Sequence, residues 1–132
     1  MSQTAKKQVD ILVVEDSIDC LLYMIHALNM FGYSFVTAQH AEPAFYLAKK
    51  HLPSLVLLDI ALPDQSGLEL AARLKRNKTT RQIPIIVMSA LEQIELQRLT
   101  IEAGCNDYIE KPYLLEELKQ KADLYLSLPV AS

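Results

Sequence analysis

The strongest constraint on this chain is a repeated alternation between short, unbroken apolar runs and longer amphipathic stretches. Unbroken apolar runs predict strands that are covered on both faces, as in a parallel sheet. The runs that we interpret as strands are Ile11–Val14, Phe35–Val36, Leu55–Leu58, Ile83–Met88 and Tyr108–Ile109. The first, third and fourth carry apolar side chains at consecutive positions, and the fifth is the weakest.

The stretches between these runs have the periodicity of amphipathic helices. In the first stretch Leu21, Ile25 and Leu28 share one face, and Gly32 supplies a C-terminal stop. Other signals predict four more helices. The second has Pro43 in its first turn and Ala44, Ala48 and His51 on one face, and the third opens with the capping-box sequence Ser66-Gly67-Leu68-Glu69. The fourth has an apolar stripe of Ile94, Leu99, Ile101 and Ala103 and ends at Gly104, and the fifth has a stripe of Leu115, Leu118, Ala122 and Tyr125.

Five successive strand–helix units predict an α/β protein with a parallel sheet and right-handed crossovers. We expect a flavodoxin-like (βα)5 three-layer sandwich whose five-stranded parallel sheet has the strand order 2-1-3-4-5. The length of 132 residues fits one domain and is too short for an eight-stranded barrel. We expect a flexible leader at 1–8, a folded domain at 9–126 and a C-terminal tail at 127–132.

Composition narrows the setting in which the chain works. The net charge of −3 argues against a broad nucleic-acid-binding face. Cys20 and Cys105 are far apart and form no CxxC motif, which is typical of small buried side chains in a reducing compartment. No apolar run reaches the ~18 residues that cross a bilayer, and no signal peptide follows Met1. We therefore expect a cytoplasmic protein without direct contact to membranes or nucleic acid.

Polar side chains follow the predicted strands at their carboxyl ends, which is where open α/β sheets bind ligands. They are Glu15 and Asp16 after the first strand, Asp59 after the third, Ser89 after the fourth and Lys111 after the fifth. Taken singly, each has a local explanation as a helix cap (Asp16 or Ser17; Ser89 with Glu92), an Asx turn (Asp59) or a surface charge (Lys111).

Taken together, the acidic side chains call for a common explanation. At ~5 Å and an effective dielectric of ~20, two like charges repel by roughly 3 kcal/mol. A bound cation relieves that repulsion, and carboxylate oxygens suit Mg²⁺, which commonly bridges to phosphate. The hydroxyl of Ser89 and the ammonium of Lys111 are suited to holding further phosphoryl oxygens. One remaining carboxylate could then act as the nucleophile that forms an acyl phosphate.

Five segments resemble the signatures of bacterial two-component response-regulator receiver domains, of the chemotaxis-regulator type. They are Ile11–Asp16, Leu57–Pro63, Ser66–Leu70, Val87–Ala90 and Tyr108–Pro112, and the match runs from Val9 to Leu126. The resemblance implies that Asp59 accepts a phosphoryl group from a sensor histidine kinase or a histidine phosphotransfer domain, with Mg²⁺ as cofactor. It further implies a phosphoacceptor that catalyses its own phosphorylation and dephosphorylation, not an enzyme in the ordinary sense.

The resemblance also assigns the metal ligands. Glu15 and Asp16 match the acidic pair that positions Mg²⁺ in the family. The expected direct ligands are Asp16, Asp59 and the backbone carbonyl of Ala61.

Further roles follow from the resemblance at the other strand ends. Lys111 matches the lysine that pairs with the phosphoacceptor, and its bond to Pro112 matches one that is cis in the family. Ser89 matches the hydroxyl that moves toward the phosphoryl group. Tyr108 matches the aromatic switch residue that turns inward when Ser89 moves, and a half-buried strand aromatic is compatible with that role.

Partners are also implied by the resemblance. The output face would comprise Gln93–Glu102, Asp107–Tyr113 and Leu114–Leu126, which shift between two packings and contact a downstream protein or the protein's own output domain. A phosphorylation-linked homodimer is a further expectation. The kinase or phosphotransfer domain would dock around Leu21–Ile25.

Two apolar positions carry a separate hypothesis about lifetime. Ala61 and Leu91 lie two residues after Asp59 and Ser89, and in the family these positions affect how water reaches the phosphoryl group. Because neither side chain can orient a water by hydrogen bonding, we expect a long-lived phosphorylated state.

Other functions fit the residues less well. A haloacid-dehalogenase-like phosphatase needs a second Asp where this chain has Ala61, and a dinucleotide-binding domain needs glycine within residues 15–18. His26, His40 and His51 lack metal-ligand spacing. The remaining alternative is a receiver-fold module that binds proteins without phosphorylation, against which the complete acid, hydroxyl and lysine set argues.

Overall fold

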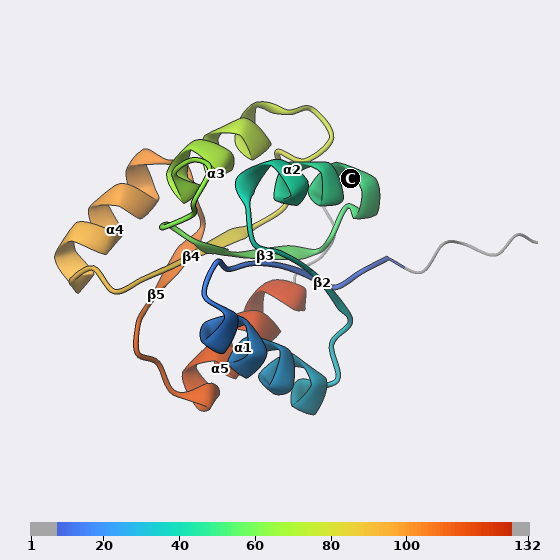
Figure 1. Cartoon of the computed structure of the whole chain (residues 1–132), viewed down its shortest axis with the longest axis vertical. Coiled ribbons are helices and arrows are strands. Elements are labelled where there is room, and N and C mark those ends of the chain that lie inside the picture. The colour runs from blue at the N-terminus through green and yellow to red at the C-terminus, as the bar shows by residue number, and fades with distance from the viewer. Residues whose placement is uncertain (1–7, 128–132) are drawn as a thin grey trace, which may run out of the picture.

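The computed structural model describes residues 8–127, in which five strands alternate with five helices (Figure 1). The strands are β1 (Ile11–Val14), β2 (Phe35–Ala38), β3 (Leu55–Asp59), β4 (Ile85–Ser89) and β5 (Asp107–Glu110). The helices are α1 (Ile18–Phe31), α2 (Ala41–His51), α3 (Gly67–Arg76), α4 (Gln93–Glu102) and α5 (Leu115–Leu126). All strand pairs are parallel and their order is β2-β1-β3-β4-β5, which confirms the predicted fold. The expected leader and tail lie outside the described residues, apart from Gln8 and Ser127.

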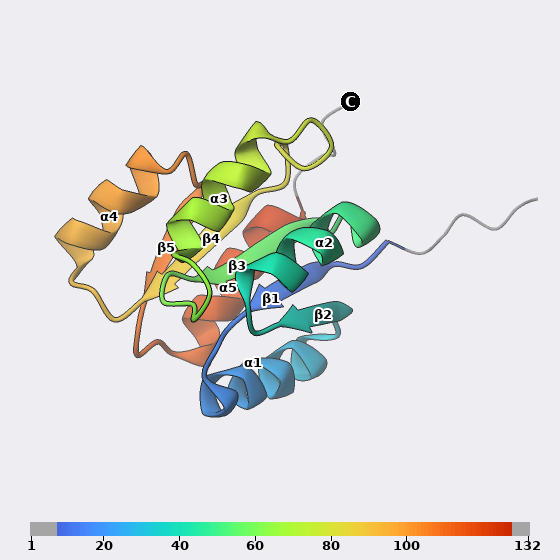
Figure 2. The same ribbon diagram turned by 45° about the horizontal axis from the view of Figure 1, so that its top comes forward.

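The sheet is the middle layer of three, with α1 and α5 on one face and α2, α3 and α4 on the other (Figure 2). Each buried strand contributes to both cores, because successive side chains point to opposite faces. In β1, Leu12 and Val14 pack toward α2, α3 and α4, whereas Ile11 and Val13 pack toward α1 and α5. This two-sided burial explains why β1 and the first four residues of β3 and of β4 are unbroken apolar runs.

Local signals in the sequence set several helix ends. Ser17 caps α1 by accepting a hydrogen bond from the backbone N–H of Cys20 at 3.3 Å. Gly32 ends that helix in the left-handed conformation, with φ of 84°. Ser66 is the N-cap of α3, as predicted, but its hydroxyl oxygen accepts from the N–H of Leu68 at 3.1 Å and not from that of Glu69, as a capping box would require.

The predicted apolar stripe of α4 is wrong for Ile94 and Ile101, whereas Ala103 packs against the core. Ile94 and Ile101 are 84% and 69% exposed, whereas Leu96 and Thr100 are buried against the sheet. Thr100 is tolerated there because its hydroxyl donates to the carbonyl of Leu96 at 2.7 Å. In α2 the buried face consists of Ala41, Ala44 and Ala48, and the predicted His51 is only half-buried.

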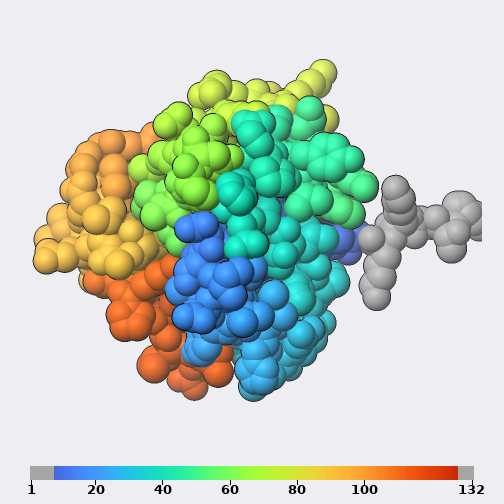
Figure 3. Space-filling view, in the orientation of Figure 1, coloured from blue at the N-terminus to red at the C-terminus, as the bar shows by residue number. Residues whose placement is uncertain are grey.

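The topology brings the carboxyl ends of β1 and β3 together. Val14 is paired with Leu58, so Glu15 and Asp59 follow neighbouring positions at this edge of the sheet. The chain then leaves β1 for α1 on one face and β3 for α3 on the other face. In Figure 3 the blue surface of the β1–α1 region adjoins the green surface around residues 60–70. A site at this edge is therefore accessible where the strand order reverses.

Candidate functional site

Lys111 joins the ends of three strands through two ion pairs. Its Nζ atom lies 2.8 Å from Oε1 of Glu15 and 3.0 Å from Oδ2 of Asp59. The side chains of Glu15 and Asp59 are only 3% and 11% exposed, and that of Lys111 is 19% exposed. Lys111 is therefore no solvated surface charge, because its ammonium pairs with two largely buried carboxylates.

Burial and neighbouring charges shift the pKa values of Glu15 and Lys111. Desolvation and the neighbouring Asp59 raise the pKa of Glu15 against the opposing effect of Lys111. Desolvation alone would lower the pKa of Lys111, but hydrogen bonds and charges from Glu15 and Asp59 outweigh it and raise that pKa. The ammonium therefore stays charged at neutral pH.

Asp59 is held in place by backbone as well as by Lys111. Its Oδ1 atom accepts a hydrogen bond from the N–H of Ala61 at 3.0 Å, which is the geometry of the predicted Asx turn. Gly67 packs so closely behind it that a Cβ there would lie 2.2 Å from the backbone oxygen of Asp59. The carboxylate is thus fixed at the end of β3 and 8% of the residue is exposed.

Ser89 lies at the end of β4, the next strand of the sheet, and is buried. Its hydroxyl oxygen accepts a hydrogen bond from the N–H of Leu91 at 3.1 Å, and α4 starts after Glu92, which makes no side-chain cap. The predicted capping box from Ser89 to Glu92 is therefore wrong. The carbonyl of Ser89 accepts from the N–H of Lys111 at 2.7 Å, and the peptide bond to Pro112 is cis, as the resemblance implied.

The donor set at this edge fits Mg²⁺ better than a softer metal. Asp16 is exposed, and its carboxylate has no hydrogen bond or ion pair to any of residues 8–127. Asp59 and the carbonyl of the exposed Ala61 add two more oxygen donors. Within the described residues, no three His, Cys, Asp or Glu side chains are grouped to hold a metal ion. One or two carboxylates with waters are nevertheless the usual protein ligands of Mg²⁺.

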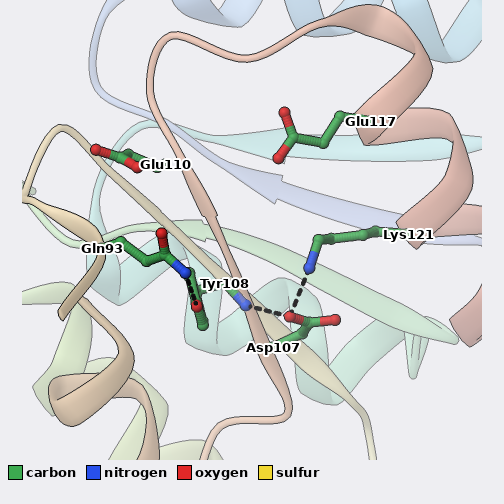
Figure 4. A pocket seen from close by; sticks show the side chains of 6 residues that line it. All are labelled: Gln93, Asp107, Tyr108, Glu110, Glu117 and Lys121. Carbon is green, nitrogen blue, oxygen red and sulfur yellow. Dashed lines mark hydrogen bonds and ion pairs between the residues drawn. The ribbon is translucent and has the colours of Figure 1, made fainter.

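Tyr108 lines a separate pocket of about 270 Å³ on the predicted output face (Figure 4). Nε2 of Gln93 donates to its hydroxyl oxygen at 3.3 Å, and Nζ of Lys121 lies 5.6 Å from its ring centroid. Lys121 also pairs with Asp107 at 2.7 Å. Sequence reasoning missed Gln93 and Lys121 as partners of Tyr108, because their spacing on two different helices carries no signal. The pocket is lined by Gln93, Asp107, Tyr108, Glu110, Glu117 and Lys121.

Residues 11–123 match the family model described as the response regulator receiver domain, and the chain belongs to this family. It is 39% identical over 108 residues to the phosphate regulon transcriptional regulatory protein PhoB of Pseudomonas aeruginosa, covering 82% of this chain and 47% of that protein. The chain thus spans about half the length of this curated relative.

Solved structures share the fold of this chain. The BeF3-activated N-terminal receiver domain of Klebsiella pneumoniae RstA is 28% identical, with a TM-score of 0.82 over 90% of this chain and 99% of that one. The receiver domain of sensor histidine kinase PA1611 from Pseudomonas aeruginosa is 24% identical, with a TM-score of 0.84 over 92% and 100% of the two chains. Its structure has a magnesium ion coordinated in the active site cleft.

Family membership decides between the classes considered above. The chain is a response-regulator receiver domain, not a haloacid-dehalogenase-like phosphatase or a dinucleotide-binding domain. Several relatives are named transcriptional regulatory proteins, so the expectation of no nucleic-acid contact finds no support for the whole protein. Among residues 8–127 there is no helix with the length and hydropathy of a membrane span.

Proposed function

We propose that this receiver domain is a phosphorylation-dependent switch in which Asp59 is the phosphoacceptor. The observation that carries the proposal is the pairing of Asp59 with Lys111 at the carboxyl edge of the sheet, 3.0 Å apart and largely buried. An Asp59 oxygen attacks phosphorus, the P–N bond of a partner's phosphohistidine breaks, and the histidine nitrogen leaves. The domain would supply this catalysis itself. It would also catalyse its own dephosphorylation, in which water attacks phosphorus, the P–O bond to Asp59 breaks and inorganic phosphate leaves.

Asp16, Asp59 and the carbonyl of Ala61 would hold Mg²⁺. When bound, Mg²⁺ supplies positive charge next to the transferring phosphoryl oxygens. Glu15 acts differently in this proposal, because its carboxylate is already engaged by Lys111 at 2.8 Å. It orients the ammonium, so its effect on the metal is electrostatic.

Lys111 and Ser89 are the groups that respond to the phosphoryl group. Phosphorylation replaces the single negative charge of the Asp59 carboxylate with up to two on the phosphoryl group and adds three acceptor oxygens. The ammonium of Lys111 can then bind a phosphoryl oxygen, and the hydroxyl of Ser89 can exchange its contact with Leu91 for another. Because the carbonyl of Ser89 is bonded to the N–H of Lys111, the ends of β4 and β5 would respond together.

The output face would be α4-β5-α5, read by a downstream protein, by an output domain of the same protein or by a second copy in a phosphorylation-linked homodimer. Tyr108 lies in this face, where its hydroxyl is bonded to Gln93 of α4 (Figure 4). The histidine kinase or phosphotransfer domain would dock on α1, where Leu22 is 58% exposed. This exchange of phosphoryl groups would take place in the cytoplasm.

Phosphorylation in vitro tests the proposal. Incubation with Mg²⁺ and acetyl phosphate should add the mass of one phosphoryl group, as measured by intact-protein mass spectrometry. Asp59→Asn should abolish the gain, whereas Asp19→Asn, a change at an exposed carboxylate in the first turn of α1, should keep it. No gain in the wild type would contradict the proposal and favour a receiver-fold module that binds proteins without phosphorylation.

A further inference from the structure

Asp64 ties the β3–α3 connection to the first turn of α2. Its Oδ1 atom accepts a hydrogen bond from the N–H of Ala41 at 2.8 Å, and its Oδ2 atom accepts one from the N–H of Glu42 at 3.0 Å. Figure 2 shows this connection, in green, beside the start of α2, in teal. One carboxylate therefore binds two backbone donors of a helix more than 20 residues away.

The tether replaces a cap that α2 does not have in its own sequence. His40 occupies the N-cap position with extended backbone, at φ −138° and ψ 157°, and its side chain makes no capping hydrogen bond. Exposed N–H groups and the helix dipole favour a carboxylate at this end. The backbone hydrogen bonds lower the pKa of Asp64, which keeps the side chain ionised and the tether intact at neutral pH.

The tethered loop carries the carbonyl proposed to bind the metal. The loop is closed at its base, where the N–H of Gly67 donates to the carbonyl of Ile60 at 2.7 Å. At the β3 end of the loop, the N–H of Ala61 is bonded to Asp59 at 3.0 Å. Three residues later, Asp64 binds the loop to α2. Ala61 thus lies between two fixed points, with the φ angle of Pro63 restricted between them.

We propose that Asp64 is a positioning residue for the Mg²⁺ site, holding the Ala61 carbonyl where the ion can bind it. This inference rests on the proposed function, because it assumes that Mg²⁺ binds at Asp59. Without the tether, part of the metal's binding free energy would be spent on ordering the loop. Groups that orient metal ligands commonly change affinity by 10- to 100-fold. We expect the lower end here, since Ala61 is one ligand among several.

Calorimetric titration with MgCl₂ tests the inference without any phosphoryl transfer. Asp64→Ala should weaken Mg²⁺ binding about tenfold. Asp64→Asn removes the same charge but leaves an amide oxygen that can accept one of the two hydrogen bonds. Its affinity should therefore lie closer to that of the wild type. Equal weakening in both variants would assign the effect to charge and overturn the proposal.

A second variant separates positioning of the loop from capping of the helix. In the double variant Asp64→Ala with His40→Ser, the serine can cap α2 locally while the loop stays untethered. We expect urea unfolding to show recovered stability and calorimetry to show Mg²⁺ binding that is still weak. Recovery of both would mean that only the helix matters, and would overturn the proposal.

The wild-type titration distinguishes failure of the positioning role of Asp64 from failure of the proposed metal site. If the wild type binds Mg²⁺ and Asp64→Ala binds it equally well, the positioning role fails and the proposed function stands. If the wild type binds no Mg²⁺ at millimolar concentration, the metal site of the proposed function fails, and this inference fails with it.

Discussion

The Nζ atom of Lys111 lies 3.0 Å from Oδ2 of Asp59, although 52 residues separate the two in sequence. The same ammonium contacts Glu15, whose carboxylate is 3% exposed. Removing the ammonium would leave the carboxylates of Glu15 and Asp59 next to each other with little access to water. We expect Lys111→Ala to lower the free energy of unfolding by about 2 kcal/mol, less than for a fully buried pair. Urea unfolding at pH 7 in EDTA measures the loss without interference from metal.

A control and a double variant sharpen this prediction. Lys119→Ala removes an exposed ion pair with Asp123 on α5 and should leave stability close to the wild-type value. In a Glu15→Gln background, Lys111→Ala should be less destabilising, because one of the two buried charges is already gone. Equal losses in Lys111→Ala and Lys119→Ala would contradict the role assigned to the buried pair.

Glu15 should make stability depend on pH in the acidic range. Desolvation and Asp59 raise its pKa in the folded protein above the ordinary value of 4.5. The folded state therefore binds this proton at a higher pH than the unfolded state. Its contribution to stability is complete below the unfolded pKa and is lost as pH rises through the folded one.

The wild type should accordingly gain stability relative to Glu15→Gln as pH falls from 7 toward 5. Urea unfolding of both proteins across this range measures the difference. A wild type that loses stability relative to the variant on acidification would show that the folded-state pKa of Glu15 is lowered instead.

Gly67 should be intolerant of any side chain for a reason of space. A Cβ would lie 2.2 Å from the backbone oxygen of Asp59 and 2.9 Å from Cα of Ile60. Because backbone atoms cannot rotate away, Gly67→Ala should cost about 3 kcal/mol in unfolding free energy. Gly104→Ala is the matched control, since it has φ of 76° but open space, and should cost about 1 kcal/mol. Similar losses in both variants would refute the steric explanation.

The sequence predicts the sheet well and the helix faces less well, for a physical reason. In β1, β3 and β4 both faces are buried, so all residues before the polar site residues Asp59 and Ser89 are apolar and the run marks the strand directly. In α4 only a narrow stripe is buried, and the helix has more apolar residues than that stripe can hold. Periodicity alone cannot tell that Leu96 faces the sheet and Ile94 does not. Thr100 adds to the ambiguity about the buried face, because its hydroxyl donates to the carbonyl of Leu96 and so allows a polar residue to be buried.

The centre of the site follows from topology, whereas its supports do not. Once β1, β3 and β5 are parallel members of one sheet, their polar ends must lie at one edge, so Glu15, Asp59 and Lys111 are predictable together. The contact of Asp64 with α2 joins two connections at their exposed surfaces. Many polar loop residues could have made that contact equally well, so no pattern in the sequence identifies it.

Ala61→Asn should shorten the lifetime of the phosphorylated state. Ala61 is exposed two residues after the proposed phosphoacceptor, and its methyl group cannot orient a water. An amide there could hold an attacking water by hydrogen bonding. A stabilisation of the transition state by about 1 kcal/mol would accelerate phosphoryl loss about fivefold. Intact-protein mass spectrometry after removal of acetyl phosphate follows this decay. Ala61→Val is the control of similar exposure, and equal rates in the two variants would count against the hypothesis.

Tyr33 should govern part of the loss of stability at alkaline pH. It lies between α1 and β2, and its hydroxyl donates a hydrogen bond to Asp123 of α5. Partial burial and the adjacent carboxylate raise its pKa from 10.0 to about 12. The folded state therefore keeps a proton that the unfolded state releases near pH 10, and this contribution to stability is lost as pH rises from 10 toward 12. Urea unfolding in that range should show a shallower decline for Tyr33→Phe than for the wild type. Tyr46→Phe is the control, because this tyrosine of α2 is 61% exposed, and its stability should follow the wild-type curve. If the curve of Tyr33→Phe also followed the wild-type curve, the hydrogen bond to Asp123 would have no effect on this titration.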